Sequence, residues 1–128
     1  MGKFVLALIV LLALGLTFPQ SRAVIVEHSE PLMYPAYHWM TTQEMSQIVD
    51  DLEFHQETRG GLPSARGEFD AWLDRRYPQE RSRHDAWGTR YRLEVTGQAF
   101  RVIAAGPDGE FGTDDDIIRE GERLAGRR

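Results

Sequence analysis

The sequence has no cysteine, and this absence excludes disulfide bridges, cysteine-based zinc sites and thiol catalysis. It leaves the compartment of the protein undecided. The sequence also lacks an excess of basic residues, since 15 Lys and Arg stand against 20 Asp and Glu, and the formal net charge is −5. That balance argues against non-specific binding to nucleic acid. A chain of 128 residues is long enough for one domain.

Apolar residues form a long run only near the N-terminus, where Lys3 precedes a nearly uninterrupted stretch over residues 4–18. A helix of that length spans about 22 Å at about 1.5 Å per residue, which is less than the hydrocarbon core of a bilayer at about 30 Å. We therefore expect residues 1–23 to be a signal peptide with its signal peptidase site after Ala23, and an uncleaved single-span membrane anchor is the alternative. In either case the residues that follow lie outside the cytoplasmic membrane, in the periplasm or the medium.

The next segment, residues 24–40, shows no clear hydrophobic period and contains Pro31 and Pro35. Proline has no backbone N–H and disfavours a helical conformation in the residue before it. We therefore expect an extended segment here, with its aromatic side chains packed on the domain that follows over residues 41–128.

That domain is predicted to begin with a helix. Thr41-Thr42-Gln43-Glu44 has the pattern of a capping box, and Gly60-Gly61 is typical of a helix end. A shorter helix is predicted over about residues 67–76, with Arg75 and Arg76 neutralising its acidic side chains. The apolar positions of the first helix recur at i, i+3, i+4 and i+7 and define one buried face: Met45, Ile48, Val49 and Leu52.

Two strands are predicted after the helices. Residues 91–95 alternate apolar and polar side chains, residues 96–98 form a short turn, and residues 99–104 return. Ile117 and Ile118 add a short third strand or begin a last turn, and residues 120–128 are expected to fray. The fold class is therefore α+β, with a helix packed on a small antiparallel sheet.

The loop between the last two of these segments is unusually acidic. Five carboxylates lie within nine residues, without a Lys or Arg among them: Asp108, Glu110, Asp114, Asp115 and Asp116. Carboxylates this close repel one another unless a cation lies between them, and Ca²⁺ is the hard cation that several oxygens bind best. Two plainer interpretations stand beside it, a helix start at residues 113–116 and a solvated turn. The spacing does not match an EF-hand loop.

Three motifs in this order resemble a known family. Gly60-Gly61-Leu62-Pro63 ends the helix, Asp85-x-Trp87-Gly88-x-x-Tyr91 precedes the hairpin, and Gly106-Pro107-Asp108-Gly109 opens the acidic loop. Together with Phe111-Gly112-Thr113-Asp114-Asp115-Asp116 they are similar to the C-terminal domain of the major pseudopilins of type II secretion, protein G. The resemblance spans about residues 41–118.

The resemblance implies a pilin-like fold, a calcium ion in the acidic loop and a structural, non-catalytic role. It implies Asp108, Asp114 and Asp116 as side-chain ligands, helped by backbone carbonyls, with Asp115 as a further ligand or pointing outward. It also implies other pseudopilins or components of a secretion apparatus as partners, in a short periplasmic filament.

The N-terminal region departs from the pattern of the family. The resemblance implies a short basic leader, a Gly-Phe cleavage site and a glutamate soon after it. Here Gly2 precedes Lys3, and no acidic residue occurs before Glu27.

Two further functions are compatible with the residues. One is a free secreted calcium-binding module without a role in secretion. The other is a metal-dependent hydrolase that uses the acidic loop. An enzyme needs an activated nucleophile or base beside a pocket, and Ser64, Ser82 and His84 do not have the spacing of a triad. We therefore expect no catalytic residues.

Overall fold

The computed structural model describes residues 2–17 and 19–124. The chain forms two compact units, Met1–Pro35 and Ala36–Arg128. In the first unit, helix α1 spans Gly2–Thr17 and helix α2 begins at Pro19. None of the helices in the described residues is both long and apolar enough to cross a bilayer. The predicted processing site at Ala23 lies within α2, among residues whose side chains are not described.

Helix α2 spans Pro19–Arg59, so the extended segment predicted over residues 24–40 is wrong. A proline removes one hydrogen bond of the helical ladder and crowds the preceding turn, at a cost of about 3 kcal/mol. Starting a helix is the expensive step, whereas extending an existing one gains a hydrogen bond with each residue fixed. The part of α2 after residue 40 is held by the core, and the helix extends through Pro31 and Pro35.

The capping box predicted at Thr41 is also wrong, because the helix has begun long before it. Thr41 is fully buried, and its hydroxyl accepts the backbone N–H of Ala86 at 3.1 Å. The Glu44 carboxylate accepts the hydroxyl of Tyr91 at 2.7 Å. These two side chains join α2 to the residues before the sheet.

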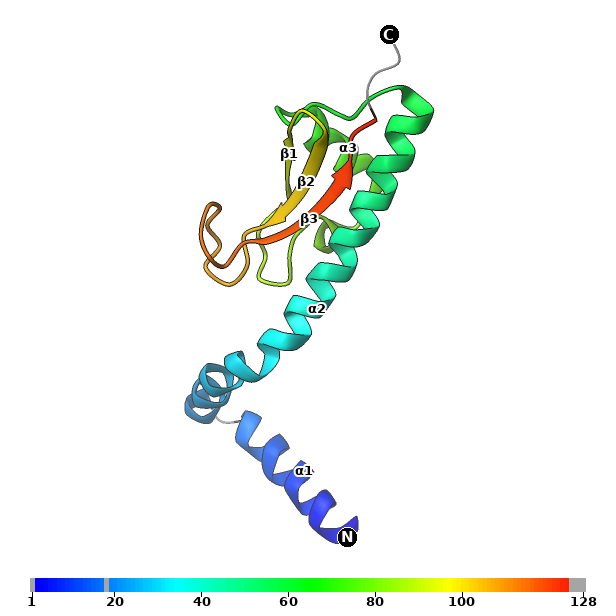
Figure 1. Ribbon diagram of the computed structural model, residues 1–128. Coiled ribbons are helices and arrows are strands. Elements are labelled where there is room, and N and C mark those ends of the chain that lie inside the picture. The colour runs from blue at the N-terminus through cyan, green and yellow to red at the C-terminus, as the bar shows by residue number, and fades with distance from the viewer. Residues whose placement is uncertain (1, 18, 125–128) are drawn as a thin grey trace. The chain divides into compact units, whose positions relative to one another are not determined.

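The sheet has three antiparallel strands in the order β1-β2-β3 (Figure 1). Strand β1 is Arg92–Val95 and strand β2 is Ala99–Ala104, as predicted. Strand β3 is Ile117–Glu122, which confirms a third strand and corrects the frayed end predicted from residue 120. The missed part contains Gly121, which pairs with Phe100 of β2. A Cβ at this glycine would lie 2.3 Å from the Phe100 ring, so the ring occupies the space of a side chain.

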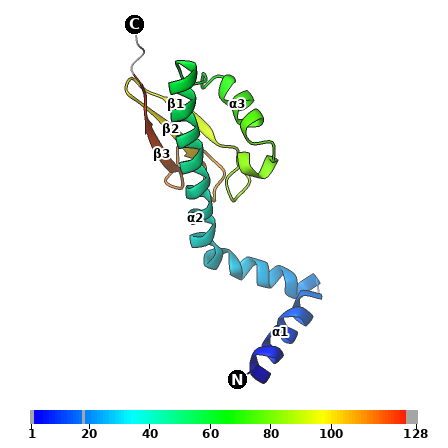
Figure 2. The same ribbon diagram turned by 90° about the vertical axis from the view of Figure 1, so that its right-hand side faces the viewer.

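Helices α2 and α3 cover one face of the sheet (Figure 2). Helix α3 spans Glu68–Arg76, and a short 3₁₀ helix, η1, follows at Glu80–Arg83. All four apolar positions predicted for the first helix are buried, which confirms its apolar face. The other buried members of the core come from α3, the sheet and the residue before it: Phe69, Trp72, Leu73, Tyr91, Leu93, Phe100, Val102, Ala104 and Ile117.

The end of β3 is tied to α2 through the buried side chain of Gln56. Its Nε2 donates to the Glu122 carbonyl at 2.6 Å, and its Oε1 accepts the Leu124 N–H at 3.0 Å. The Glu122 N–H donates to the Glu53 carboxylate at 3.1 Å. Side chains of α2 thus satisfy backbone groups that an edge strand would otherwise expose.

Candidate functional site in the acidic loop

The acidic loop, residues 105–116, leaves β2 and returns into β3 (Figure 1). The two ends of the loop lie close together, because Gly106 has a φ of 75° and lies against the backbone of Asp115. We call this close approach of Gly106 and Asp115 the neck of the loop. A Cβ at Gly106 would be 2.3 Å from the Asp115 carbonyl oxygen. Only glycine fits both the left-handed conformation and this close approach.

Asp85 fixes the neck of the loop from outside. Its carboxylate is buried, with the residue 4% exposed, and accepts three backbone N–H groups. Oδ1 accepts from Trp87 at 3.1 Å and from Thr89 at 2.9 Å, while Oδ2 accepts from Gly106 at 3.1 Å. Charge-assisted hydrogen bonds of this kind offset the cost of burying a carboxylate. Two motifs that the sequence analysis treated separately therefore form one unit.

The sequence analysis missed this role of Asp85. It assigned Asp85-x-Trp87-Gly88 to a turn that delivers a tryptophan to the core. An aspartate that begins a turn commonly accepts a backbone N–H two residues later, and this signal was available. The third bond, to Gly106, joins residues 21 positions apart and has no local signature.

Asp108 is held within the loop by its own neighbours. Its Oδ1 accepts the Glu110 N–H at 3.0 Å, and its Oδ2 accepts the Thr113 hydroxyl at 2.5 Å. The Thr113 hydroxyl, followed by the Glu110 N–H, lowers the pKa of Asp108. The carboxylate is thereby kept in its charged form at an exposed position.

Asp116 is only half satisfied. Its Oδ2 accepts the Gly112 N–H at 2.8 Å, whereas its Oδ1 is buried and has no hydrogen-bond partner among residues 2–17 and 19–124. A buried oxygen of a carboxylate is rarely left unpaired unless an ion or another donor completes it. Asp116 is therefore the predicted ligand with the clearest need for a cation.

The other carboxylates of the loop are exposed. Asp114 and Asp115 lie in a turn that leads into β3, so the alternative of a helix start at residues 113–116 is wrong. Glu110 also points to solvent. The structure thus places Asp108 and Asp116 in hydrogen-bonded positions and leaves Asp114 and Asp115 outside them.

The donor set suits a hard cation, because every candidate ligand is an oxygen. Within residues 2–17 and 19–124, no group of three His, Cys, Asp or Glu side chains is close enough to hold a metal ion. Ca²⁺ takes six to eight oxygens and accepts backbone carbonyls and water among them. Carbonyls of the loop would thus have to supply part of a calcium site, and calcium stays a prediction.

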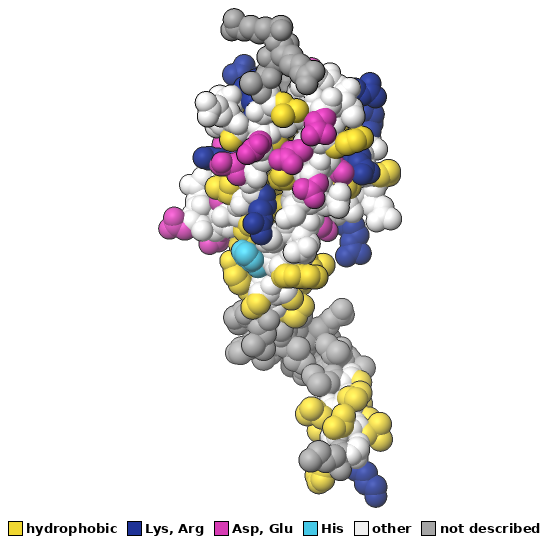
Figure 3. Space-filling view, turned by 45° about the vertical axis from the view of Figure 1, so that its right-hand side comes forward, with side chains coloured by type: hydrophobic (Ala, Val, Ile, Leu, Met, Phe, Trp, Pro, Cys, Tyr) yellow, Lys and Arg dark blue, Asp and Glu magenta, His cyan; other side chains and the backbone are white. Residues whose placement is uncertain are grey.

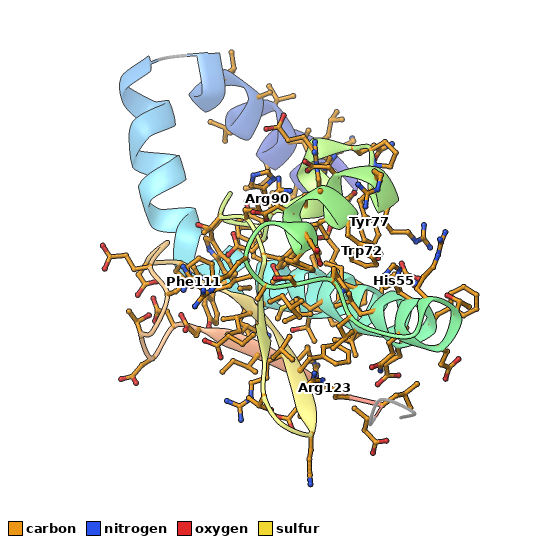
Figure 4. The ribbon with its side chains drawn as sticks, turned by 90° about the horizontal axis from the view of Figure 1, so that it is seen from above. His55, Trp72, Tyr77, Arg90, Phe111 and Arg123 are labelled. Carbon is orange, nitrogen blue, oxygen red and sulfur yellow. The ribbon has the colours of Figure 1, made fainter. Side chains whose placement is uncertain are left out.

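An aromatic contact holds the tip of the loop. The guanidinium carbon of Arg92, on β1, lies 4.0 Å from the ring centroid of Phe111, which Figure 4 labels. This is the geometry of a cation–π contact. The loop is thus fixed to the sheet at its neck and at its tip, and its carboxylates are held between these points.

The acidic residues of α3 do not extend this site. Arg90 binds Asp70 at 3.1 Å and Asp74 at 2.6 Å, and Arg83 binds Asp74 at 2.6 Å. The expectation that Arg75 and Arg76 neutralise them is therefore wrong. Arg76 instead pairs with a carboxylate of α2 at 3.1 Å. The carboxylates of α3 bind arginines of a neighbouring segment and not those of α3 itself, because α3 packs beside the segment that carries Arg83 and Arg90.

Comparison with known proteins gives a consistent result. The family model described as "Type II secretion system (T2SS), protein G" matches residues 36–120. The chain is also 49% identical over 39 residues to the type II secretion system core protein G of Escherichia coli (strain K12). That alignment covers 29% of this chain and 27% of the relative, so it spans about a quarter of that protein's length. No solved structure matches.

The family match covers more than half of the chain and includes the helix, the sheet and the acidic loop. The family is structural and non-enzymatic, which confirms the expectation that the protein is not an enzyme. The long helix on a three-stranded antiparallel sheet confirms the pilin-like fold. The chain therefore belongs to the type II secretion system protein G family.

Proposed function

We propose that the chain is a pseudopilin-like structural subunit of a type II secretion apparatus in the cell envelope. The observation that carries this proposal is the family match over residues 36–120. The domain that it covers has its elements in the order that the sequence motifs predict. The partners would be other pseudopilins or further components of the apparatus, and the domain would lie outside the cytoplasmic membrane.

The N-terminal helix supports a role in contact with an apolar environment. Side chains of α1 are strongly exposed, as Phe4 at 84% and Leu11 at 67% illustrate. Apolar side chains exposed along a helix gain free energy when a lipid or protein surface covers them. A signal peptide and a single-span anchor both agree with this feature.

We also propose that the acidic loop binds Ca²⁺. Asp108, Asp114 and Asp116 would hold the ion together with backbone carbonyls, and Asp115 is a further candidate. The buried, unpaired Oδ1 of Asp116 supports this assignment. A bound ion would stabilise the folded loop in proportion to its preference for it, and so hold the edge of the sheet where β3 begins.

The experiment is cross-linking of the tagged full chain in its own host, followed by identification of the captured proteins. Capture of other pseudopilins or of a secretin channel supports the proposal. Their absence in a host that carries a working type II system would favour a free calcium-binding module. N-terminal sequencing of the mature chain in membrane and soluble fractions distinguishes an anchor from a cleaved leader.

A further inference from the structure

A basic cleft lies between the end of α2 and α3. His55 and Arg59 come from α2, and Trp72 and Arg75 come from α3. These four residues, which define the basic cleft, line two adjoining hollows of about 590 and 520 Å³. The rings of His55 and Trp72 are 6.0 Å apart and edge to face, and Figure 4 shows them next to each other.

The positive charge of the cleft has no ion-pair partner in the part of the chain that the structure describes. The Glu68 carboxylate lines one of the two hollows, but it accepts the backbone N–H of Ser64. Among the described residues, neither Arg59 nor Arg75 forms an ion pair, although Arg76 beside them binds Asp51 at 3.1 Å. Burial lowers the pKa of His55, and the positive charges of Arg59 and Arg75 lower it further because they disfavour a protonated imidazole beside them. Two unpaired guanidinium groups beside an aromatic ring are suited to carboxylate groups of a ligand.

Charge elsewhere on the domain limits what that ligand can be. Figure 3 shows acidic side chains near the middle of one face and basic side chains mainly at its margins. A chain with a net charge of −5 repels a general polyanion, so binding of an anionic ligand depends on local charge complementarity.

The chain itself carries a segment with the required negative charge. In the acidic loop, Glu110 and Asp115 are exposed, form no ion pair among the described residues and are not among the three principal calcium ligands we propose.

The loop cannot reach the cleft of its own chain. Figures 1 and 2 both show the loop and the last turn of α2 at opposite ends of the domain. Contact between the two surfaces therefore requires a second copy. A contact between two different surfaces is heterologous, and its repetition gives a ring or an open filament.

We propose that the basic cleft of one copy binds Glu110 and Asp115 in the acidic loop of a second copy. This inference rests on the proposed function and deepens it by naming the two surfaces that meet. Arg59 and Arg75 supply the charge, and Trp72, which is largely buried, lines both hollows with them. The contact adds subunits head to tail.

Disulfide trapping tests the contact, because the natural chain has no cysteine. Full-length Ala71→Cys places a thiol at the cleft, and full-length Pro107→Cys places one at the exposed start of the loop. Mixing the two variants under mild oxidation should give a mixed disulfide dimer. Gly97→Cys, in the turn between β1 and β2, is the matched control and should give at least about tenfold less of it with Ala71→Cys.

Charge reversal then tests the recognition itself. Arg59→Glu with Arg75→Glu, added to Ala71→Cys, should lower the yield of mixed dimer about tenfold. Glu110→Arg with Asp115→Arg in the partner variant should restore it. The control is Arg66→Glu with Arg81→Glu, which changes the net charge by the same amount at exposed positions outside the cleft. Circular dichroism confirms that each variant is folded.

Equal yields from the Pro107 and Gly97 variants, or no effect of reversing Arg59 and Arg75, would overturn the inference. If either of these results is found while the chain still captures secretion components in its host, the inference fails and the proposed function stands. If the mixed dimer forms as expected but no secretion component is captured, the proposed function fails while the contact between copies stands.

Discussion

Two carboxylates, those of Asp85 and Asp116, differ in how fully the chain around them satisfies their oxygens. Asp85 is buried and accepts three backbone N–H groups, so the turn at residues 85–89 is satisfied by the chain alone. Asp116 accepts one N–H, and its other oxygen is buried without a partner in the described part of the chain. The comparison teaches that the turn is complete as a structural support, whereas the acidic loop keeps an acceptor oxygen that the described residues leave unfilled.

Removing Asp85 should cause the largest loss. Asp85→Ala leaves three N–H groups without an acceptor, among them the buried one of Gly106, and should cost about 3 kcal/mol of unfolding free energy. Urea unfolding measures it. Asp114→Ala, at an exposed position, is the control and should stay within about 0.5 kcal/mol without calcium. A loss below about 1 kcal/mol at Asp85 would show that the turn does not depend on it.

Calcium should stabilise the loop by a comparable amount. At a hundredfold excess over its dissociation constant, the ion adds about 2.7 kcal/mol, and Mg²⁺ should add less because it demands a stricter geometry. Scanning calorimetry with chelator, Ca²⁺ and Mg²⁺ measures the shift in Tm. Asp116→Asn should abolish the shift, and Glu110→Gln should keep it. An unchanged Tm in the natural chain would remove calcium from the description of the loop.

The neck of the loop should tolerate only glycine. Gly106→Ala adds a Cβ 2.3 Å from the Asp115 carbonyl oxygen at a φ of 75°, and should cost about 2 kcal/mol. Gly97→Ala, where the space is open, is the control. Thermal unfolding compares the two, and equal stabilities would mean that the neck can open without loss.

The smallest effect should appear at high pH. Burial, followed by the hydrogen bond to Glu44, raises the pKa of Tyr91 well above its usual value. Above about pH 10 the unfolded chain loses this proton and the folded chain keeps it, so stability falls as pH rises. Tyr91→Phe should make the fall between pH 9 and 11 shallower in urea titrations. Tyr34→Phe is the control, and equal slopes in both variants would exclude Tyr91 as the cause.

The sequence predicted those elements whose signal is local. The spacing of Met45, Ile48, Val49 and Leu52 identified the buried face of α2, because a helical period directly reports which side is covered. The alternation in residues 91–95 and the turn at 96–98 identified the hairpin in the same way. The crowding of carboxylates identified the acidic loop as the candidate site.

The wrong predictions arose where a local pattern was overruled by contacts elsewhere in the fold or by the continuation of a helix. Thr41 and Glu44 have the spacing of a cap, but they bind Ala86 and Tyr91 from the middle of a helix. Pro31 indicates a break when read locally, yet α2 continues through it. Gly121 suggests a weak strand, because the Phe100 ring that fills its space is known only from the register.

The sequence by itself determined the apolar faces, the hairpin and the accumulation of negative charge, because hydrophobic period and charge spacing act over a few residues. Only the tertiary structure decided how the charges are distributed among partners. It gave Asp85 three donors. Within the described residues, it left an oxygen of Asp116 without a donor and Arg59 and Arg75 without a carboxylate. Hydrogen bonds and ion pairs depend on atoms within about 4 Å in space, and residues far apart along the chain reach that distance only once it has folded.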